Sequence, residues 1–221
     1  MTGTSMLIKL VSAATAQTLI MVFFSTVFSV LLGLPLGVLL SVTDGETGIR
    51  PRPVLNQVLT RIVNILRSFP FIILMILLFP LSRLILHTSI GTRATIVPLS
   101  IAAAPFVARV IETALKEIDP GVIQAARACG STNWQIIRKV MLPEALPALV
   151  DGITLTIINL IGYSAMAGAI GGGGLGDLAI RYGYQRFRTD VMIAAVVVIL
   201  VLVEVIQTVG TKISARMMRR R

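Results

Sequence analysis

The stretch that decides the fold is QAARACGSTNWQIIRKVMLP, residues 124–143. It carries three basic residues and no acidic one, and it lies between two apolar runs that are long enough to enter a bilayer. Apolar residues recur at helical spacing on both sides of Gly130, and Leu142-Pro143 close the second segment. Two spans can be connected by a few residues. The stretch therefore predicts a rigid helical hairpin with a role of its own.

The composition around this stretch is that of an integral membrane protein. Of 221 residues, 55% are hydrophobic and only 14% are charged, and the mean hydropathy is +0.89. A soluble domain of this size needs more polar surface. The net charge of +10 comes from basic residues that flank apolar runs, which favours membrane orientation and anionic lipid over nucleic acid. The one cysteine, Cys129, excludes an intrachain disulfide.

The apolar runs predict an all-α protein, because they are long and continuous and lack the alternation of a membrane barrel. We expect a single transmembrane domain, residues 1–221, with five spans at about 17–41, 58–79, 94–111, 149–169 and 191–211. Gly33 to Gly37 predict a kink and a close helix contact in the first span. Pro98 and Pro105 predict breaks in the third. We expect no cleaved signal peptide.

Arginine and lysine set the predicted orientation. If the loops 42–57 and 112–148 and the C-terminal tail are cytoplasmic, twelve of the twenty basic residues lie inside and six lie outside. Cytoplasmic loops carry the excess of basic residues. The sequence therefore predicts an N-terminus outside and a C-terminus in the cytoplasm, with the hairpin on the cytoplasmic side. The basic tail is interpreted as a membrane anchor.

The hairpin itself is predicted in detail within the loop 112–148. Asp119 is a candidate N-cap, Pro120 suits the first helical position, and Gly130 permits a sharp turn. Ser131 is a candidate N-cap for a second helix over 132–141, which Pro143 ends. The predicted apolar faces are Val122, Ile123, Ala125, Ala126 and Cys129 on the first helix, and Trp134, Ile137 and Met141 on the second. The hairpin is either a docking site for a cytoplasmic partner or a surface element packed on its own bundle.

The sequence contains no evident energy source. It has no Gly-rich phosphate loop ending in Lys-Ser or Lys-Thr. The only carboxylate inside a predicted span is Glu204, which supports ion coupling weakly. No Cys, His, Asp or Glu cluster has metal-ligand spacing, and no catalytic residue is assigned. A separate ATPase docked at 119–143 would supply the energy. Five helices enclose a pathway poorly, so a symmetric homodimer is expected.

The spacing of the hairpin residues resembles the signature loop of binding-protein-dependent ABC importer permeases. That family has Glu-Ala-Ala, three residues, Gly, nine residues, Ile, one residue and Leu-Pro. This chain keeps both spacings, with Gln124 in place of Glu and Val140 in place of Ile. The segments RSFPFIIL (67–74), TSIGTRATIVPLSIAAAPFVAR (88–109), RKVMLPEALPALV (138–150) and GYSAMAGAIGGGGLGDLA (162–179) resemble methionine importer permeases in particular.

The resemblance implies a type I importer in the inner membrane, a two-fold dimer with coupling helices in the hairpin. It also implies two ATPase subunits, which would bind ATP and Mg, and an extracytoplasmic methionine-binding protein. No cofactor is expected on this chain. The implied ATPase-coupling residues are Gln124, Ala125, Ala126, Gly130, Leu142 and Pro143. The substrate follows from the resemblance alone, so another amino acid or small metabolite stays open. An ion-coupled carrier acting alone is the alternative from another class.

Four residues are candidates for the translocation pathway: Arg67, Pro70, Tyr163 and Met166. Arg67 either faces the pathway or extends to the cytoplasmic interface because Pro70 breaks its helix. Met166 lies among small residues and is either a gate at the dimer axis or ordinary packing. A Ser164–His87 intramembrane hydrolase is a further alternative, although nothing in the sequence indicates a nucleophile elbow.

Overall fold

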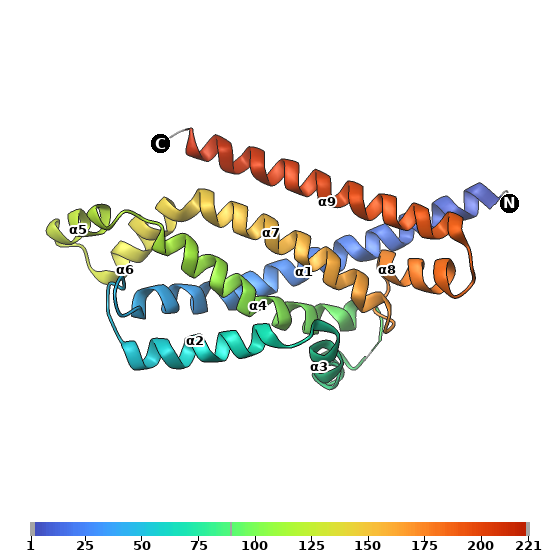
Figure 1. The fold of residues 1–221 in the computed structure, drawn as a ribbon, viewed down its shortest axis with the longest axis horizontal. Helices are drawn as coiled ribbons and strands as arrows, with labels where there is room; N and C mark the ends of the chain where they lie inside the picture. Colours follow the sequence, from blue (N-terminus) through green and yellow to red (C-terminus); the bar gives the residue numbers. More distant parts are fainter. Residues whose placement is uncertain (1–2, 89, 220–221) are drawn as a thin grey trace. The chain divides into compact units, whose positions relative to one another are not determined.

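Helices make up the regular structure of the protein (Figure 1). The structure is a computed structural model, and it describes residues 3–88 and 90–219. Within these residues there is no strand, so the all-α prediction is confirmed. The elements are α1 (Gly3–Thr43), α2 (Pro53–Ser68), α3 (Phe71–Leu86), α4 (Thr92–Lys116), α5 (Pro120–Ala128), α6 (Asn133–Ile136), η1 (Ile137–Met141), α7 (Leu142–Gly168), α8 (Gly174–Leu178), η2 (Ala179–Tyr184) and α9 (Thr189–Met218).

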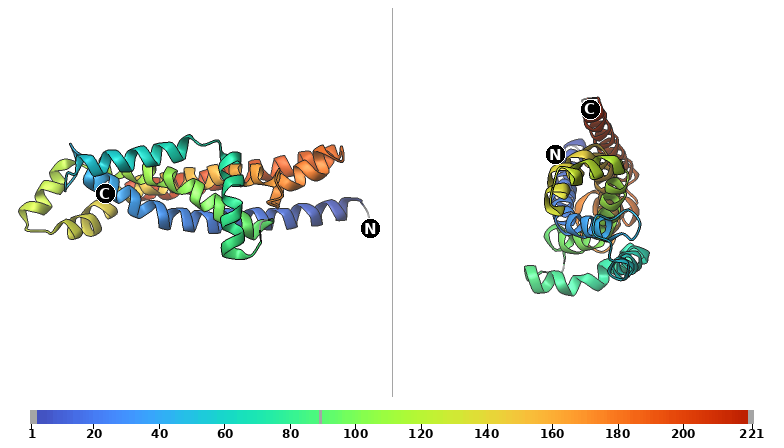
Figure 2. Two further views of the ribbon diagram at one scale, coloured as in Figure 1. Left: turned by 90° about the horizontal axis from the view of Figure 1, so that it is seen from below. Right: turned by 90° about the vertical axis from the view of Figure 1, so that its left-hand side faces the viewer.

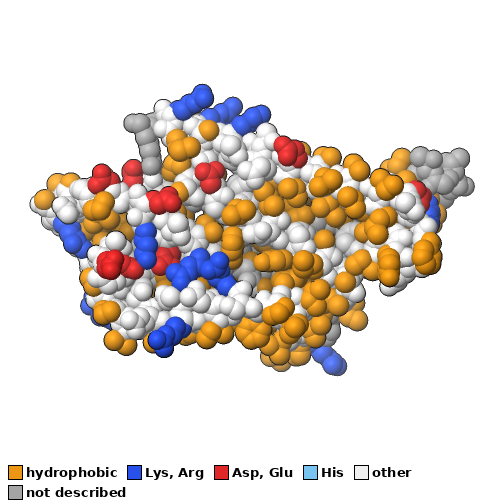
Figure 3. All heavy atoms as spheres, viewed as in Figure 1, with side chains coloured by type: hydrophobic (Ala, Val, Ile, Leu, Met, Phe, Trp, Pro, Cys, Tyr) orange, Lys and Arg blue, Asp and Glu red, His pale blue; other side chains and the backbone are white. Residues whose placement is uncertain are grey.

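Four helical stretches in the described residues are long and apolar enough to cross a membrane. They are α1, α4, the run from α6 through α7, and α9. The bent pair α2 and α3 adds a fifth if it crosses as one span, so the predicted count of five stays a prediction. Apolar side chains cover much of the face drawn in Figure 3, as expected for helices in contact with lipid.

The chain folds into two compact units, each assembled from separate segments. The first unit contains residues 1–29, 69–103 and 156–208, and the second contains residues 30–68, 104–155 and 209–221. Each of α1, α4, α7 and α9 has residues in both units, whereas α2 belongs to the second and α3 to the first. The hairpin and the residues that hold it belong to the second unit.

The core of the second unit forms where α1 and α4 approach closely. Val107, Ile111 and Leu115 are buried along one side of α4. A Cβ built at Gly37 of α1 would lie 2.5 Å from the carbonyl oxygen of Ala108, so only glycine permits this approach. The close contact predicted for 33–37 is confirmed.

The first unit has its core between α1, α4 and α7, around Met21, Leu99 and Leu160. Beside it, the start of α8 is held by α1. The backbone N–H of Gly174 donates to Oε1 of Gln17 at 2.9 Å, and that of Leu175 donates to Oγ1 of Thr18 at 2.9 Å. Figure 2 shows α8 and the neighbouring helices from two further directions.

The prolines of the second and third predicted spans affect their helices differently. Pro98 and Pro105 do not break the third apolar run, because α4 is continuous from Thr92 to Lys116 and both prolines are buried in it. Packing against neighbouring helices keeps a helix continuous across a proline in a membrane protein. The run 58–79 is instead interrupted, since α2 ends at Ser68 and α3 begins at Phe71 after Pro70. The interpretation that Pro70 breaks this helix is confirmed.

Candidate functional site

The hairpin begins with a fixed helix start at Asp119. The Asp119 carboxylate accepts a hydrogen bond from the backbone N–H of Gly121 at 2.7 Å, and Pro120 occupies the first helical position. Both predictions are confirmed. A side-chain cap of this kind stabilises a helix by about 0.5–2 kcal/mol, so α5 starts at a defined residue.

The turn after α5 is a Schellman motif. The N–H of Ser131 donates to the carbonyl oxygen of Ala126 at 3.1 Å, and the N–H of Gly130 donates to that of Arg127 at 2.9 Å. Gly130 has φ +78°, which a side chain with a Cβ adopts only at a cost. The glycine turn predicted from the sequence is therefore present, and it joins α5 to α6 through residues 129–132 (Figure 2).

The second helix starts one residue later than predicted. Thr132, and not Ser131, is the N-cap: its hydroxyl accepts from the N–H of Gln135 at 3.3 Å, and the Gln135 side chain accepts from the N–H of Thr132 at 2.8 Å. A capping box needs Glu or Gln three residues after the N-cap, and Gln135 meets this requirement for Thr132. Three residues after Ser131 the sequence has Trp134, which cannot complete the box.

Pro143 does not end this helix, contrary to the prediction. α6 continues through the π-helical turn η1 into α7, and the N–H of Leu142 donates to the carbonyl oxygen of Ile137, five residues back. The wider turn shifts the hydrogen-bond pattern by one residue, so Pro143 enters as the second residue of α7, where its missing N–H costs little. The hairpin is thus continuous with a long apolar helix.

The two helices of the hairpin bury one side and leave the other uncovered in this chain. Ile136 and Met141 are buried in the second unit's core, and Ile123 and Ala126 pack against it. Trp134 is 67% exposed and Met141 is buried, so the single apolar face predicted for the second helix is divided between the uncovered and the buried side. The remaining exposed hairpin residues include Gln124, Ala125, Ala128, Cys129, Arg138 and Lys139. No residue of α5 is fully buried.

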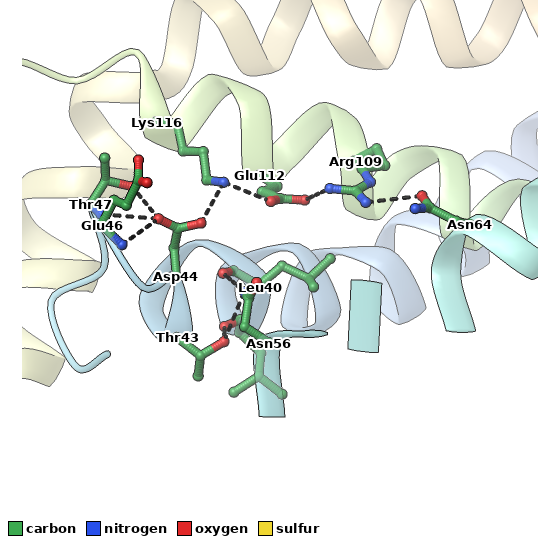
Figure 4. A network of polar contacts seen from close by, with 11 residues as sticks. Leu40, Thr43, Asp44, Glu46, Thr47, Asn56, Asn64, Arg109, Glu112 and Lys116 are labelled. Carbon is green, nitrogen blue, oxygen red and sulfur yellow. Dashed lines mark hydrogen bonds and ion pairs between the residues drawn. The ribbon is translucent and has the colours of Figure 1, made fainter. Parts of the chain in front are cut away.

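A chain of polar contacts lies behind the hairpin, at the ends of α1, α2 and α4 (Figure 4). The Lys116 ammonium is 2.8 Å from the Asp44 carboxylate and 3.0 Å from that of Glu112. Arg109 is 2.6 Å from Glu112, and its other terminal nitrogen donates to Oδ1 of Asn64 on α2 at 2.9 Å. Figure 3 shows charged side chains gathered over α2 and α4.

The two carboxyl groups among these polar contacts, those of Asp44 and Glu112, differ in their surroundings. The hydrogen bond from Lys116 holds the pKa of the Asp44 carboxyl well below its usual range, with further help from Thr47 and Glu46. Glu112 is only 3% exposed, yet it faces two cations. Both carboxyl groups are thus held in place by basic side chains of α4.

Arg67 lies in the last turn of α2 and lines a groove of about 390 Å³ in the second unit. Arg109 lines the same groove, together with Phe106 and Val110 of α4 and Leu155 of α7. The groove thus combines two guanidinium groups with an apolar wall. Thr113 and Glu117 line it as well, and the Arg109 guanidinium is already paired with Glu112 and Asn64.

The other pathway candidates lie in the first unit. Pro70 precedes α3, and the ring of Phe71 stacks on that of Tyr163 with centroids 4.2 Å apart. Met166 is 48% exposed. The structure therefore brings Tyr163 next to the start of α3 and leaves Met166 on an uncovered surface.

Ser164 is not an exposed nucleophile. Its hydroxyl is buried and donates to the carbonyl oxygen of Ile161 in its own helix at 2.7 Å. His87 ends α3 in a left-handed conformation and is exposed. Among residues 3–88 and 90–219, no group of three or more His, Cys, Asp or Glu side chains could hold a metal. These findings weigh against the hydrolase alternative.

The sequence did not predict the chain of polar contacts, nor the hydrogen bond from Arg127 to the carbonyl oxygen of Ile49 at 2.7 Å. The spacing of Arg109, Glu112 and Lys116 at i, i+3 and i+7 on an otherwise apolar helix was the available signal for one part of the polar contacts. Asp44 and Asn64 carried no such signal, because only the fold brings them to α4.

Long apolar helices, together with a capped hairpin whose outer face is uncovered, define a multi-pass membrane protein. Residues 33–219 match the family model described as "Binding-protein-dependent transport system inner membrane component". The chain belongs to this family of inner-membrane transport components.

Its relatives include named transport permeases. The chain is 50% identical over 207 residues to a probable D-methionine transport system permease protein MetI of Vibrio cholerae, covering 94% of this chain and 92% of that protein. It is 54% identical over 153 residues to the D-methionine transport system permease protein MetI of Escherichia coli K12, covering 69% and 70%. A solved inward-facing structure of the MetNI methionine ABC transporter contains a chain with a TM-score of 0.93 and 47% identity, covering 98% of this chain and 99% of that one.

Proposed function

We propose that this chain is the permease subunit of an ATP-driven importer that moves methionine across the cytoplasmic membrane by alternating access. The hairpin at 119–143 carries the proposal. Its helices are fixed by caps and a Schellman turn, its inner side is anchored in the core, and its outer side is uncovered. Such an element transmits a push from a partner instead of absorbing it.

The partner at the hairpin is proposed to be an ABC ATPase, present as two copies. ATP and Mg would bind to that partner, and this chain would be a transport subunit without a cofactor or catalytic residue of its own. The contact residues are proposed to be Gln124, Ala125, Ala126, Gly130, Leu142 and Pro143. Trp134 joins them because an exposed tryptophan is a frequent anchor of protein interfaces.

The path of the chain supports five crossings. Four helical stretches in the described residues are long and apolar enough to cross a membrane, and between α1 and α4 the chain returns through the bent pair α2 and α3. If that return is one broken span, the N-terminus lies outside and the C-terminus in the cytoplasm. The excess of basic residues in the loops 42–57 and 112–148 supports the same orientation.

A second copy of this chain is proposed to complete the pathway, and an extracytoplasmic methionine-binding protein to deliver the substrate. Arg67, Pro70, Tyr163 and Met166 are proposed pathway residues. Arg67 lines the groove of about 390 Å³ between α2, α4 and α7, which supports its place in the pathway. The names of the relatives support methionine as substrate. Another amino acid is the alternative.

Reconstitution in proteoliposomes tests the proposal. With the ATPase subunit, the methionine-binding protein and ATP, we expect labelled methionine to accumulate, and we expect none when any one of these is left out. Trp134→Ala should weaken ATPase association by about 30-fold, as loss of a hot-spot residue does. Phe187→Ala is the matched control, since Phe187 is 87% exposed but lies outside the hairpin. Uptake by this chain alone without ATP would instead support an ion-coupled carrier.

A further inference from the structure

We propose that residues 44–49, here called the latch loop, form a second connection through which the hairpin moves the membrane helices, and that Arg127 is the positioning residue of this connection. The inference rests on the proposed role of the hairpin as the docking element of an ATPase. It adds a defined route from the hairpin to α1 and α2, beside the direct continuation of the hairpin into α7.

Arg127 reaches from the last turn of α5 to the latch loop. Its terminal nitrogen donates to the carbonyl oxygen of Ile49 at 2.7 Å. The Ile49 side chain is buried in the same core cluster as Ile118 and Ile136, so the acceptor is held in place. A hydrogen bond from a charged donor to a fixed acceptor is directional and stronger than one between neutral groups.

The latch loop is stiff enough to transmit a displacement. Oδ1 of Asp44 accepts from the N–H groups of Glu46 and Thr47 at 3.1 and 3.0 Å, and from the Thr47 hydroxyl at 3.0 Å. A Cβ at Gly48 would lie 2.4 Å from the carbonyl oxygen of Asp44, so the loop is folded tightly on itself. After the loop, the N–H of Arg50 donates back to the carbonyl oxygen of Val42 at 3.0 Å. The loop therefore moves together with the end of α1.

The same loop is bound to α4, and α2 is bound to the end of α1 that precedes the loop. Asp44 pairs with Lys116, which also contacts the buried Glu112. The start of α2 is tied to the end of α1, because Nδ2 of Asn56 donates to the carbonyl oxygen of Leu40 at 2.7 Å (Figure 4). A displacement of Ile49 thus reaches α1, α2 and α4 through hydrogen bonds and an ion pair within the second unit.

Arg127 and its acceptor residue Ile49 line a cavity under the hairpin. A space of about 240 Å³ lies between α5, the latch loop and the end of α4, and its lining includes Gln124, Thr47 and Lys116. Apolar contacts such as that of Ile123 have little directional preference, whereas the Arg127–Ile49 hydrogen bond does.

The test measures methionine taken up per ATP hydrolysed in proteoliposomes that contain the whole complex and the binding protein. Arg127→Gln should lower this ratio by at least about threefold, because a charged hydrogen bond is lost, while the ATPase still copurifies. Arg127→Lys keeps a donor and should retain at least half of the wild-type ratio. Gly48→Ala displaces the acceptor from the loop side and should act like Arg127→Gln. Arg216→Gln, at an exposed arginine of α9, is the control and should change nothing.

Three outcomes contradict the proposal. An unchanged ratio in Arg127→Gln removes the route through Arg127. Loss of the ATPase from Arg127→Gln, with normal thermal stability, makes Arg127 a docking residue instead. A normal ratio in Gly48→Ala excludes the latch loop even if Arg127→Gln folds poorly. Failure of the wild-type complex to take up methionine with ATP would overturn the proposed function, which is a separate result.

Discussion

Arg109 and Glu112 form an ion pair of 2.6 Å on α4, in which the carboxylate is 3% exposed. Lys116 contacts the other carboxylate oxygen at 3.0 Å, so one buried anion holds two cations of the same helix. The cost of burying Glu112 is offset only while both partners stay in place. This arrangement gives α4 a fixed polar face toward Asp44 and Asn64.

Glu112→Gln should lower the stability of the purified chain by on the order of 1–3 kcal/mol, because Arg109 loses its carboxylate partner and Lys116 keeps only Asp44. Thermal unfolding in detergent measures the change. Asp190→Asn is the matched control, since the Arg188–Asp190 pair is exposed and should contribute nothing measurable. Equal shifts in both variants would show that burial of Glu112 is not important.

Gly37→Ala should destabilise the chain by about 1–3 kcal/mol, as overpacking does. Its Cβ would meet the carbonyl oxygen of Ala108 at 2.5 Å and the Cβ of Ile111 at 2.7 Å. Gly162→Ala is the comparison, because nothing lies within 4 Å of a Cβ there and alanine favours a helix by about 1 kcal/mol. The two substitutions should shift the thermal midpoint in opposite directions. A stabilised Gly37→Ala would disprove the close contact of α1 with α4.

Substitutions at Gly130 should follow the cost of a positive φ. Nothing lies within 4 Å of a Cβ at this position, so the effect is conformational and not steric. Gly130→Asn should be tolerated better than Gly130→Ala, and Gly130→Val should be worst, with a cost of roughly 1–2 kcal/mol for alanine. The amount of ATPase that copurifies with each variant measures the order. The same yield in all three would mean that the turn does not set the hairpin geometry.

The contribution of Asp44 should vanish in acid. Lys116 depresses the pKa of the folded-state carboxyl, so the stabilisation is fully present above the unfolded-state value of about 3.9. It decreases as the pH falls from there toward the depressed folded-state pKa. The thermal midpoints of wild type and Asp44→Asn should therefore differ by a constant amount from pH 5 to 7. The difference should become progressively smaller as the pH falls below about 4. A difference that grows in acid would contradict this sign.

The sequence predicted those parts of the fold that depend on local pattern. Apolar runs identified the long helices, and Asp119, Pro120 and Gly130 identified the first helix and turn of the hairpin, because caps and positive φ are local requirements. It failed at Pro143 and Pro98, where neighbouring turns and packing decide whether a proline ends a helix. Trp134 and Met141 were predicted on one apolar face, but only Met141 is buried, because the π-helical turn η1 changes the residue spacing between them.

The parts that could not be predicted depend on distant residues. Arg127 bonds a backbone carbonyl 78 positions away, and any residue type could supply that acceptor. Asp44 and Lys116 are 72 positions apart. Of the proposed coupling residues, only the spacing of Gln124, Gly130 and Pro143 is visible in the sequence, and the resemblance to a family was needed to suggest a partner.

Cys129 gives the most direct test of the claim that an ATPase docks on the hairpin. It is the only cysteine of the chain and is exposed beside Gly130, so a maleimide reports on this surface without mutation. We predict rapid labelling of the chain alone and labelling slowed by at least about tenfold in the complex with the ATPase, as expected for a site excluded from water at an interface core. Equal labelling rates with and without the bound ATPase would contradict docking at this hairpin.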